Sequence, residues 1–461
     1  MFLLSLATGA WSLATHRQLE GLGGMVDEWF LVGLNLRVHG TLGIEPGRPD
    51  VVLAPGYPVF AAALAALSPA PSAVTTAYLR RSMGLLFAAQ AVLLAASAAA
   101  LFLWLSNRLG TPAALAAGTI LGTNPYTVAL VGLLHYDVLH IALLVAGSWA
   151  LQEACDRRER STWPFVAAGA IWGAATLVRP VTLILPFFVA AGLLLLEGLR
   201  PRRVLRATAA FVLGMALIVS PFTIRNRALT GRWVAVNAEG WMALWGSTAR
   251  VLGIHPNHYN WGELYVDDFL PIFRRVTGEP TYSRHAFIDH TLALDDAFRE
   301  AALANIRERP GIYATNGLRS FAAFNLGFNS VLVRVFQHLQ RTPAWPSQDW
   351  FSVGRSQDFL PRPAGTGVDV FVGLLTLLAG AGLVVGALRR DPGLVAAAAV
   401  YACLCAAHSL VYMDLMYYYA KVPFLLVFGA WALARLPKRE GAWAATGLAS
   451  LSLLLTAFVL A

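Results

Sequence analysis

Long apolar runs, separated by short polar loops, make up most of this chain of 461 residues. Most of the runs have about the 18 residues or more that an α-helix needs to cross a ~30 Å hydrocarbon core, so we expect about 11 transmembrane helices. The first run resembles a secretory signal but lacks a positively charged start, and we expect it to be kept as the first helix. The expected spans are 1–16, 80–105, 112–133, 137–153, 163–179, 181–197, 204–223, 367–388, 393–412, 419–435 and 441–460. The pattern therefore predicts an all-α polytopic membrane protein.

Two polar segments, 17–79 and 224–366, are too long to be simple connections between spans. Within the first segment, residues 29–36 and 59–64 are apolar or amphipathic but too short to span. Such stretches are typical of helices that lie at the membrane interface. We therefore expect interfacial helices in the first of the two segments.

The second long segment contains two further helical patterns. Asp289–Arg309 has helical spacing with its charges on one face. Residues 311–328 are apolar but interrupted by polar side chains, which predicts a juxtamembrane helix rather than a span. The chain accordingly divides into three parts: an N-terminal transmembrane module (1–223) that includes the first external segment, a large extracytoplasmic segment (224–366) and C-terminal transmembrane helices (367–461).

Composition and charge support the membrane class and fix an orientation. Hydrophobic residues make up 57% of the chain and charged residues only 13%, whereas soluble domains carry about 25% charged residues. The net charge of +9 lies largely in short loops between spans, as in cytoplasmic loops, and this placement argues against nucleic acid as a partner. Following the spans in order puts these loops on one side and segments 17–79 and 224–366 on the other. We expect a cytoplasmic N-terminus and an external C-terminus in the plasma (inner) membrane.

Several kinds of chemistry are not indicated by the sequence. The three cysteines, Cys155, Cys403 and Cys405, lie in or beside apolar runs, and their spacing matches neither a disulfide framework nor a zinc motif. Walker A, GxGxxG and HExxH motifs are also absent from the sequence. Chemistry on a soluble nucleotide sugar would need a nucleotide-binding domain for which the short cytoplasmic loops leave no room.

An adjacent acidic pair, Asp27 and Glu28, opens the first external segment. Carboxylates beside an apolar surface are costly to desolvate, and burial raises the pKa of such a group. A carboxylate there could take the proton of an acceptor hydroxyl as its oxygen attacks a carbon. The alternative is a solvated pair at the end of a helix.

Five short motifs, in order along the chain, resemble those of the GT-C membrane glycosyltransferases. The likeness is to bacterial relatives of the dolichyl-phosphate-mannose–protein mannosyltransferases, and it covers nearly the whole length. Each motif is weak alone, and the order and expected external location make the set specific. The motifs are Asp27-Glu28-Trp29 with Pro55-Gly56-Tyr57-Pro58, Leu177-Val178-Arg179-Pro180, Pro221-Phe222-Thr223-Ile224-Arg225-Asn226, Gly240-Trp241 with Leu244-Trp245-Gly246, and Tyr418-Tyr419-Ala420-Lys421-Val422-Pro423.

The resemblance implies a GT-C fold and an inverting transfer of sugar from a polyprenyl-phosphate-linked donor. Asp27 would then be the catalytic base, and Glu28 would orient it or contact the acceptor. The leaving lipid phosphate needs cations or polar donors nearby. Arg179, Arg225 and the Tyr419–Lys421 segment lie at expected external ends of spans and would bind this phosphate. The alternative for each base is an ordinary interface anchor. The family often has Tyr at the place of Trp29 and Arg-Tyr at the place of Tyr418-Tyr419.

A second acidic position is indicated by His135 and Asp137, which lie at the expected external mouth between two spans. Some relatives of the family carry an acidic residue near here that serves the acceptor or a divalent cation. A His and a carboxylate two residues apart would share a metal only with further ligands, so the metal is left open. His408 lies inside an expected span, where an ionisable group is a functional candidate or a hydrogen-bonded helix contact.

The sequence thus predicts an inverting glycosyltransferase that acts on the extracytoplasmic face. Its partners would be a polyprenyl-phosphate sugar, membrane lipids, and an acceptor that is a protein, glycolipid or cell-wall glycan. A transporter or lipid flippase would explain the spans equally well. Transporters often show inverted repeats and broken helices at the midplane, and the sequence shows neither. A non-catalytic scaffold is the third alternative, which the intact acidic pair disfavours.

Overall fold

A computed structural model describes residues 2–15, 28–69, 71–72, 74–158, 161–197, 200–248, 269–326, 371, 373–384, 391–411 and 419–460. Within these residues every regular element is a helix. The all-α fold class predicted from the apolar runs is therefore confirmed.

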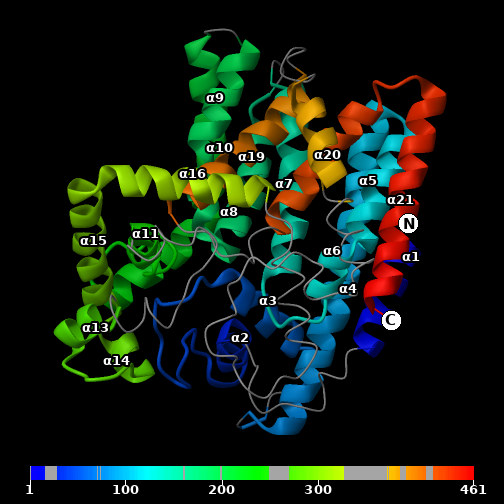
Figure 1. The fold of residues 1–461 in the computed structure, drawn as a ribbon. Coiled ribbons are helices and arrows are strands. Elements are labelled where there is room, and N and C mark those ends of the chain that lie inside the picture. Colours follow the sequence, from blue (N-terminus) through cyan, green and yellow to red (C-terminus); the bar gives the residue numbers. More distant parts are fainter. Residues whose placement is uncertain are drawn as a thin grey trace.

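The apolar runs form a bundle of helices (Figure 1). Its members are α1 (Phe2–Thr15), α4 (Thr76–Leu109), α5 (Thr111–Thr123), α6 (Pro125–Leu130), α7 (Asp137–Asp156), α8 (Trp163–Val178), α9 (Leu185–Glu197) with the 3-10 turn η2 (Pro180–Ile184) before it, α10 (Pro201–Thr230), α19 (Pro392–Leu410), α20 (Val422–Leu433) and α21 (Lys438–Leu460). Helix α7 packs against α4, α8, α19 and α20 and is therefore central to the bundle.

Five described helical stretches are long and apolar enough to cross a membrane. They are Thr76–Leu109, Asp137–Asp156, Pro180–Glu197, Pro201–Thr230 and Pro392–Leu410. Shorter apolar helices accompany them at Gly56–Ala65, Trp163–Val178, Gly373–Val384 and Tyr419–Leu433. The chain is thus a multi-pass membrane protein, and the total of about 11 spans stays a prediction.

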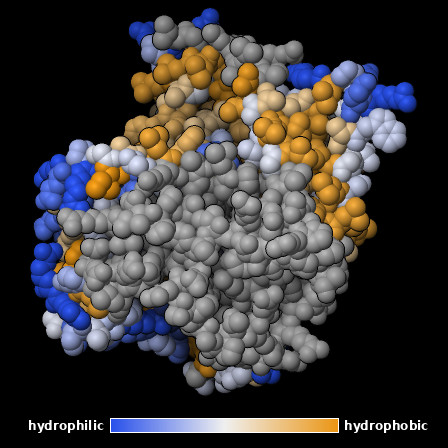
Figure 2. Space-filling model, in the orientation of Figure 1, coloured by the Kyte–Doolittle hydropathy of each residue, from blue (hydrophilic) through white to orange (hydrophobic). Residues whose placement is uncertain are grey.

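Exposed apolar side chains show where lipid covers the bundle. Along α10, Leu205, Leu213 and Ile224 are 70%, 55% and 61% exposed. Figure 2 shows hydrophobic residues over the upper part of the molecule, where the bundle lies, and hydrophilic residues at the left, near α13–α15. Soluble monomeric proteins rarely expose an apolar surface of this kind, so we infer that this face of α10 lies against the hydrocarbon of the membrane.

Helices α8 and α10 touch along glycines. A Cβ at Gly169 would lie 2.0 Å from the carbonyl oxygen of Phe211, and one at Gly214 would lie 2.0 Å from that of Val166. In a membrane, where lipid tails are as apolar as leucine, close backbone approach through small residues is a main source of helix association. The glycines therefore lock α8 against α10, and the position of α8 sets that of Arg179 at its end.

Two of the expected spans have other bounds in the structure. The run 112–133 is divided, because α5 ends at Thr123 and α6 begins at Pro125. Asn124 between them is extended, with ψ of 142°, which is the conformation favoured before proline. Helix α10 continues beyond the expected end at residue 223 as far as Thr230, where Gly231 adopts φ of 71° and terminates it.

The two long external segments also fold as helices. The expected interfacial stretches form α2 (Glu28–His39) and α3 (Gly56–Ala65). The large segment contributes α11 (Gly240–Thr248), α13 (Leu270–Thr277), α14 (Arg284–Asp289), α15 (Thr291–Glu308) and α16 (Pro310–Leu326). Figure 1 shows α16 lying across the bundle, roughly perpendicular to α9 and α10, as expected for a juxtamembrane helix.

A separate apolar core joins the two external segments. Val32, Ile44 and Leu53 from the first segment are buried together with Trp245 and Phe298 from the second, among others. Ala238 donates its backbone N–H to the carbonyl of Val51 at 2.9 Å. The two segments, almost 200 residues apart in sequence, therefore form one cap beside the bundle. We use the term external cap for the described parts of 28–69 and 231–309, after the side of the membrane that the loop charges predict for them.

Candidate functional site

Glu28 is the member of the predicted acidic pair that the structure describes. Asp27 lies outside the described residues, and α2 begins at Glu28. The Glu28 side chain is 46% exposed and forms an ion pair with Arg284 of α14 at 3.1 Å. A carboxylate in the first turn of a helix also interacts favourably with the helix dipole. Glu28 is thus held in place by both halves of the cap.

Trp29 connects this position to the second predicted acidic site. Its ring packs edge-on against His135, at 5.6 Å between centroids, and against Tyr136, at 5.4 Å. His135 Nδ1 in turn lies 2.9 Å from Asp137 Oδ1, and both side chains are buried. Trp29, which follows the acidic pair in sequence, therefore packs against the second predicted acidic site.

The Pro-Gly-Tyr-Pro motif packs against the Leu-Val-Arg-Pro turn. A Cβ at Gly56 would lie 2.6 Å from the backbone of Leu177 and Val178, so glycine is required for this approach. The next residue, Tyr57, donates its hydroxyl to Gln90 of α4 at 3.4 Å. Gln90 itself donates to the carbonyls of Val131 and Leu133 at 2.8 Å. The motif thus fixes both the turn that carries Arg179 and the loop that carries His135.

Arg179 lies at the end of α8 and is buried, with 5% of the residue exposed. Its guanidinium carbon lies 5.3 Å from the centre of the Tyr136 ring, within range of a cation–π interaction. Its Nη1 donates to the hydroxyl of Tyr419 at 3.4 Å. Two residues predicted to bind donor phosphate, Arg179 and Tyr419, are therefore in direct contact.

His140 of α7 completes this group and was missed in the sequence analysis. Its Nδ1 lies 3.0 Å from the Tyr419 hydroxyl, and both residues are fully buried. Arg179 and His408 are close enough to interact electrostatically with it. The signal that could have found it is an ionisable residue in the apolar run 137–153. We call His140, Arg179 and Tyr419 the polar triad.

Lys421 follows Tyr419 by two residues and contacts α16. Its ammonium group donates to the carbonyls of Phe324, at 2.7 Å, and Asn325, at 3.3 Å. These carbonyls belong to the last turn of α16, where a cation is favourable. Lys421 is 3% exposed and so ties α16 to the start of α20. Its role in phosphate binding stays a prediction.

Arg225 binds the first external segment and not the polar triad in this structure. Near the end of α10, its Nη2 donates to the carbonyls of Leu42, at 2.6 Å, and Asp50, at 3.0 Å. Its neighbour Asn226 donates to the carbonyls of Val234 and Val236. These bonds attach the first external segment to α10. Whether Arg225 also meets a donor phosphate stays a prediction.

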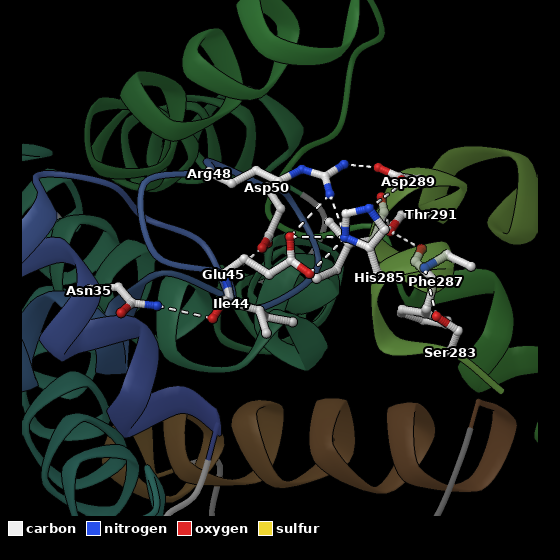
Figure 3. A network of polar contacts seen from close by, with 12 residues as sticks. Asn35, Ile44, Glu45, Arg48, Asp50, Ser283, His285, Phe287, Asp289 and Thr291 are labelled. Atoms are coloured by element: carbon white, nitrogen blue, oxygen red, sulfur yellow. Dashed lines mark hydrogen bonds and ion pairs between the residues drawn. The ribbon is translucent and has the colours of Figure 1, made fainter. Parts of the chain in front are cut away.

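A polar network on the cap joins loop 40–52 to α14 (Figure 3). Arg48 forms ion pairs with Glu45 and with Asp289, and His285 lies 3.0 Å from Glu45 Oε1. The hydrogen bond with His285 holds the pKa of Glu45 below its usual value. Asp50 accepts the backbone N–H groups of Ile44 and Val52 and so shapes the loop. The network holds the two external segments in register.

Glu239, at the start of α11, is a second residue that the sequence analysis missed. Burial raises the pKa of its carboxyl to about 8, and the charges of Glu28, Asp50 and Asp295 add to this rise. Burial also raises the pKa of Asp295 to about 6. Such values suit proton transfer near neutral pH. Three carboxyl groups from distant parts of the chain, those of Glu28, Asp50 and Asp295, thus lie close enough to Glu239 to act on it electrostatically.

A metal site is not evident in the described part of the chain. Among those residues, no group of three or more His, Cys, Asp or Glu side chains is placed to hold an ion. His135 and Asp137 provide two potential ligands. A divalent cation at this position would need further ligands and stays a prediction.

Part of the chain matches a known protein-family model. Residues 72–224 match the family model described as dolichyl-phosphate-mannose-protein mannosyltransferase. The match runs from α4 into α10 and so includes His135, Asp137, His140 and Arg179. Among curated proteins, none matches this chain.

Solved structures match the fold over almost the whole chain. The archaeal oligosaccharyltransferase AglB from Archaeoglobus fulgidus, in complex with an inhibitory peptide and a dolichol-phosphate, superposes with a TM-score of 0.55 at 12% identity; the match covers 99% of this chain and 55% of that one. A second structure from this organism, an oligosaccharyltransferase with Zn and sulfate, gives 0.51 at 13% identity and covers 98% and 52%. ArnT from Cupriavidus metallidurans, bound to undecaprenyl phosphate, gives 0.40 at 14% identity and covers 94% and 77%.

The chain spans about half the length of the oligosaccharyltransferase structures that it matches. The family segment and the fold together confirm the resemblance stated from the sequence motifs.

Proposed function

We propose that this membrane protein, whose fold is that of the GT-C glycosyltransferases, transfers a sugar from a polyprenyl-phosphate-linked donor to an acceptor hydroxyl. The transfer inverts the anomeric carbon and takes place at the extracytoplasmic face of the plasma membrane. Acceptors of the class are proteins, glycolipids or cell-wall glycans.

One observation carries the proposal. The Tyr136 ring contacts both Trp29, the residue that follows the acidic pair in sequence, and Arg179. A transferase of this kind needs a base for the acceptor and a cation for the leaving phosphate on either side of the sugar. The contacts of Tyr136 therefore support a site that has a base for the acceptor and a cation for the phosphate.

The proposed reaction uses the carboxylate of Asp27 as general base. It takes the proton of the acceptor hydroxyl while the oxygen forms a bond to the anomeric carbon. The bond between that carbon and the phosphate oxygen breaks, and the electron pair leaves with the lipid phosphate. Arg179 and Tyr419, which are in contact, would stabilise the charge that develops there.

The acceptor side would be formed by the external cap. Glu28 and Glu239 interact electrostatically, and Glu239 has a raised pKa. A protonated carboxyl can donate a hydrogen bond to an acceptor oxygen, whereas an ionised one can receive its proton. These groups support an acceptor that presents hydroxyl groups.

The donor class is supported by the membrane setting of the site. The polar triad lies at the ends of apolar helices, at the depth where we expect the phosphate of a membrane lipid. The oligosaccharyltransferase whose fold matches was solved with a dolichol-phosphate. A polyprenyl monophosphate is therefore the donor carrier that we propose.

The test uses the full-length protein purified and reconstituted into nanodiscs. It is incubated with radiolabelled polyprenyl-phosphate mannose, glucose, galactose or arabinose and a panel of peptide, glycolipid and glycan acceptors. Removal of a general base lowers the rate by about 100-fold or more, so Asp27→Asn should abolish most transfer from the donor that is used. Transfer that survives Asp27→Asn would overturn the base assignment. If the protein consumes none of the donors, or moves lipid across vesicles without transfer, the enzyme proposal fails.

A further inference from the structure

His140 has one ring nitrogen that is bonded and one that is not. Its Nδ1 lies 3.0 Å from the Tyr419 hydroxyl. Its Nε2 is buried and has no hydrogen-bond partner in the described part of the chain. A buried polar group left without a partner costs about 1–3 kcal/mol. Folded proteins rarely carry that cost unless the group has a role, such as binding a ligand.

The surroundings of His140 indicate what kind of ligand would satisfy this nitrogen. Arg179 and His408 are the charged or ionisable groups that act on it electrostatically. Arg179 reaches the same Tyr419 hydroxyl that His140 contacts. An imidazole nitrogen that lies near a guanidinium group is suited to bind an anion together with it.

We propose that His140 is a phosphate-binding residue of the donor site, with Nε2–H donating to an oxygen of the polyprenyl monophosphate. Its Nδ1 meanwhile holds the Tyr419 hydroxyl, so one ring serves the ligand and the positioning of Tyr419. The inference rests on the proposed function, because it assigns a residue to the donor site of that reaction.

The helix gives His140 the fixed geometry that this role needs. His140 lies in the first turn of α7, and its backbone N–H bonds the carbonyl of Tyr136 at 2.9 Å. Tyr136 is the residue that stacks with Arg179. The polar triad is thus joined through one helical turn to the aromatic contact between Tyr136 and Trp29.

Two amide variants separate the functions of the two ring nitrogens. The side-chain amide of His140→Gln reaches the position of Nε2, whereas that of His140→Asn reaches the position of Nδ1. The proposal predicts that His140→Asn keeps the contact with Tyr419 and loses the donor to phosphate. His140→Gln should keep that donor. Ser148→Ala, a buried substitution on the same helix, is the matched control.

The measurement is binding of farnesyl phosphate, a short polyprenyl monophosphate, to each variant in nanodiscs. Farnesol and inorganic phosphate are the comparison probes. A hydrogen bond to a charged group is lost in His140→Asn, so the Kd for farnesyl phosphate should rise about 10-fold or more. His140→Gln should stay within about 3-fold of the wild type. Farnesol should bind all variants alike, and thermal unfolding reports whether each variant is folded.

The proposal is overturned if folded His140→Asn binds farnesyl phosphate as tightly as the wild type. It is equally overturned if both amide variants lose affinity together with thermal stability, because His140 would then serve the fold alone. Binding that depends on His140 without any sugar transfer would refute the proposed function and leave this inference standing. Transfer by the wild type together with normal binding by His140→Asn would refute this inference alone.

Discussion

Arg225 reaches back from the end of α10 into the first external segment. Its guanidinium donates to two backbone carbonyls, those of Leu42 and Asp50. Those carbonyls belong to a loop with few regular hydrogen bonds of its own, so the arginine replaces what a strand or helix would supply. A residue with this many protein contacts contributes to stability whatever else it binds.

The first prediction concerns Arg225→Ala. A hydrogen bond to a charged group contributes about 1.5–3 kcal/mol, so the variant should lose about 2 kcal/mol or more of unfolding free energy. Thermal unfolding in detergent measures this loss. The control is Arg227→Ala, which removes a cation–π contact with the exposed Trp233 and should cost about 0.5–1 kcal/mol. An unchanged Tm with weaker binding of farnesyl phosphate would instead favour the phosphate role expected from the motif.

Glu239 gives the second prediction, a pH dependence of stability. Its pKa in the folded protein is about 8, above the ordinary value of 4.5. The folded state therefore holds a proton that the unfolded state has already released, and stability falls as the pH rises from about 4.5 to 8. Glu239→Gln removes the charge and should raise stability by about 1 kcal/mol or more at pH 8.

The check is a series of Tm measurements between pH 5 and pH 8.5. The difference in Tm between the Gln variant and the wild type should grow with pH. Glu308→Gln is the control, because the Glu308 side chain is 65% exposed and its replacement should leave the pH profile unchanged. A difference that is constant across the pH range would contradict the raised pKa.

At the scale of elements, the contact between α8 and α10 depends on two glycines. Carbonyl oxygens of the partner helix occupy the space that a side chain at Gly169 or Gly214 would need. A methyl group at either position must push the helices apart, and this moves the turn that carries Arg179. Overpacking of this kind costs about 1–3 kcal/mol.

The third prediction follows from this contact. Gly169→Ala should lower stability by about 2 kcal/mol and weaken donor binding, because Arg179 shifts with α8. Gly84→Ala in α4 is the matched control, since a Cβ there meets nothing within 4 Å and alanine favours a helix by about 0.5–1 kcal/mol. Thermal unfolding and farnesyl phosphate binding are measured for both. Equal stability of the two variants would show that the glycine contact is not needed.

The elements themselves could largely be predicted from the apolar runs, because length and hydropathy decide which segments enter a membrane. The division at Asn124 could have been anticipated from Pro125, which disfavours helical backbone in the residue before it. The motifs indicated Arg179 and Tyr419 but not the group that they form with His140, because the three residues come from separate runs. Glu239 was missed for a similar reason, since its raised pKa depends on carboxyl groups that only folding brings together.

At the scale of the whole molecule, the polar network of Figure 3 connects the two halves of the external cap. Arg48 of the first segment pairs with Asp289 of the second. Both side chains are about one-third exposed, and such pairs contribute about 0.2–1 kcal/mol. Their value lies in the alignment of Glu28 and Arg284, which pair across the same junction.

The fourth prediction is a charge exchange at this junction. Arg48→Asp should lower sugar transfer several-fold, because the like charges of residues 48 and 289 loosen the cap. Asp289→Arg should have a similar effect, and the double exchange should restore most of the activity. Stability should change by about 1 kcal/mol or less in each single variant, and added salt should reduce the differences. Failure of the double exchange to restore transfer would contradict the role of this pair.

The shared core of the external cap has a consequence for biosynthesis. Val32 and Leu53 pack against Phe298, which emerges from the ribosome only after some 240 further residues have been made. At about 5–20 residues per second, this interval lasts roughly 10–50 s. During that time Val32 of α2 and Leu53 of the following loop lack their partners from the second segment, while the bundle helices that precede α11 in the chain enter the membrane. Until α11 to α15 have been made, this uncovered apolar surface leaves the nascent chain open to aggregation and proteolysis.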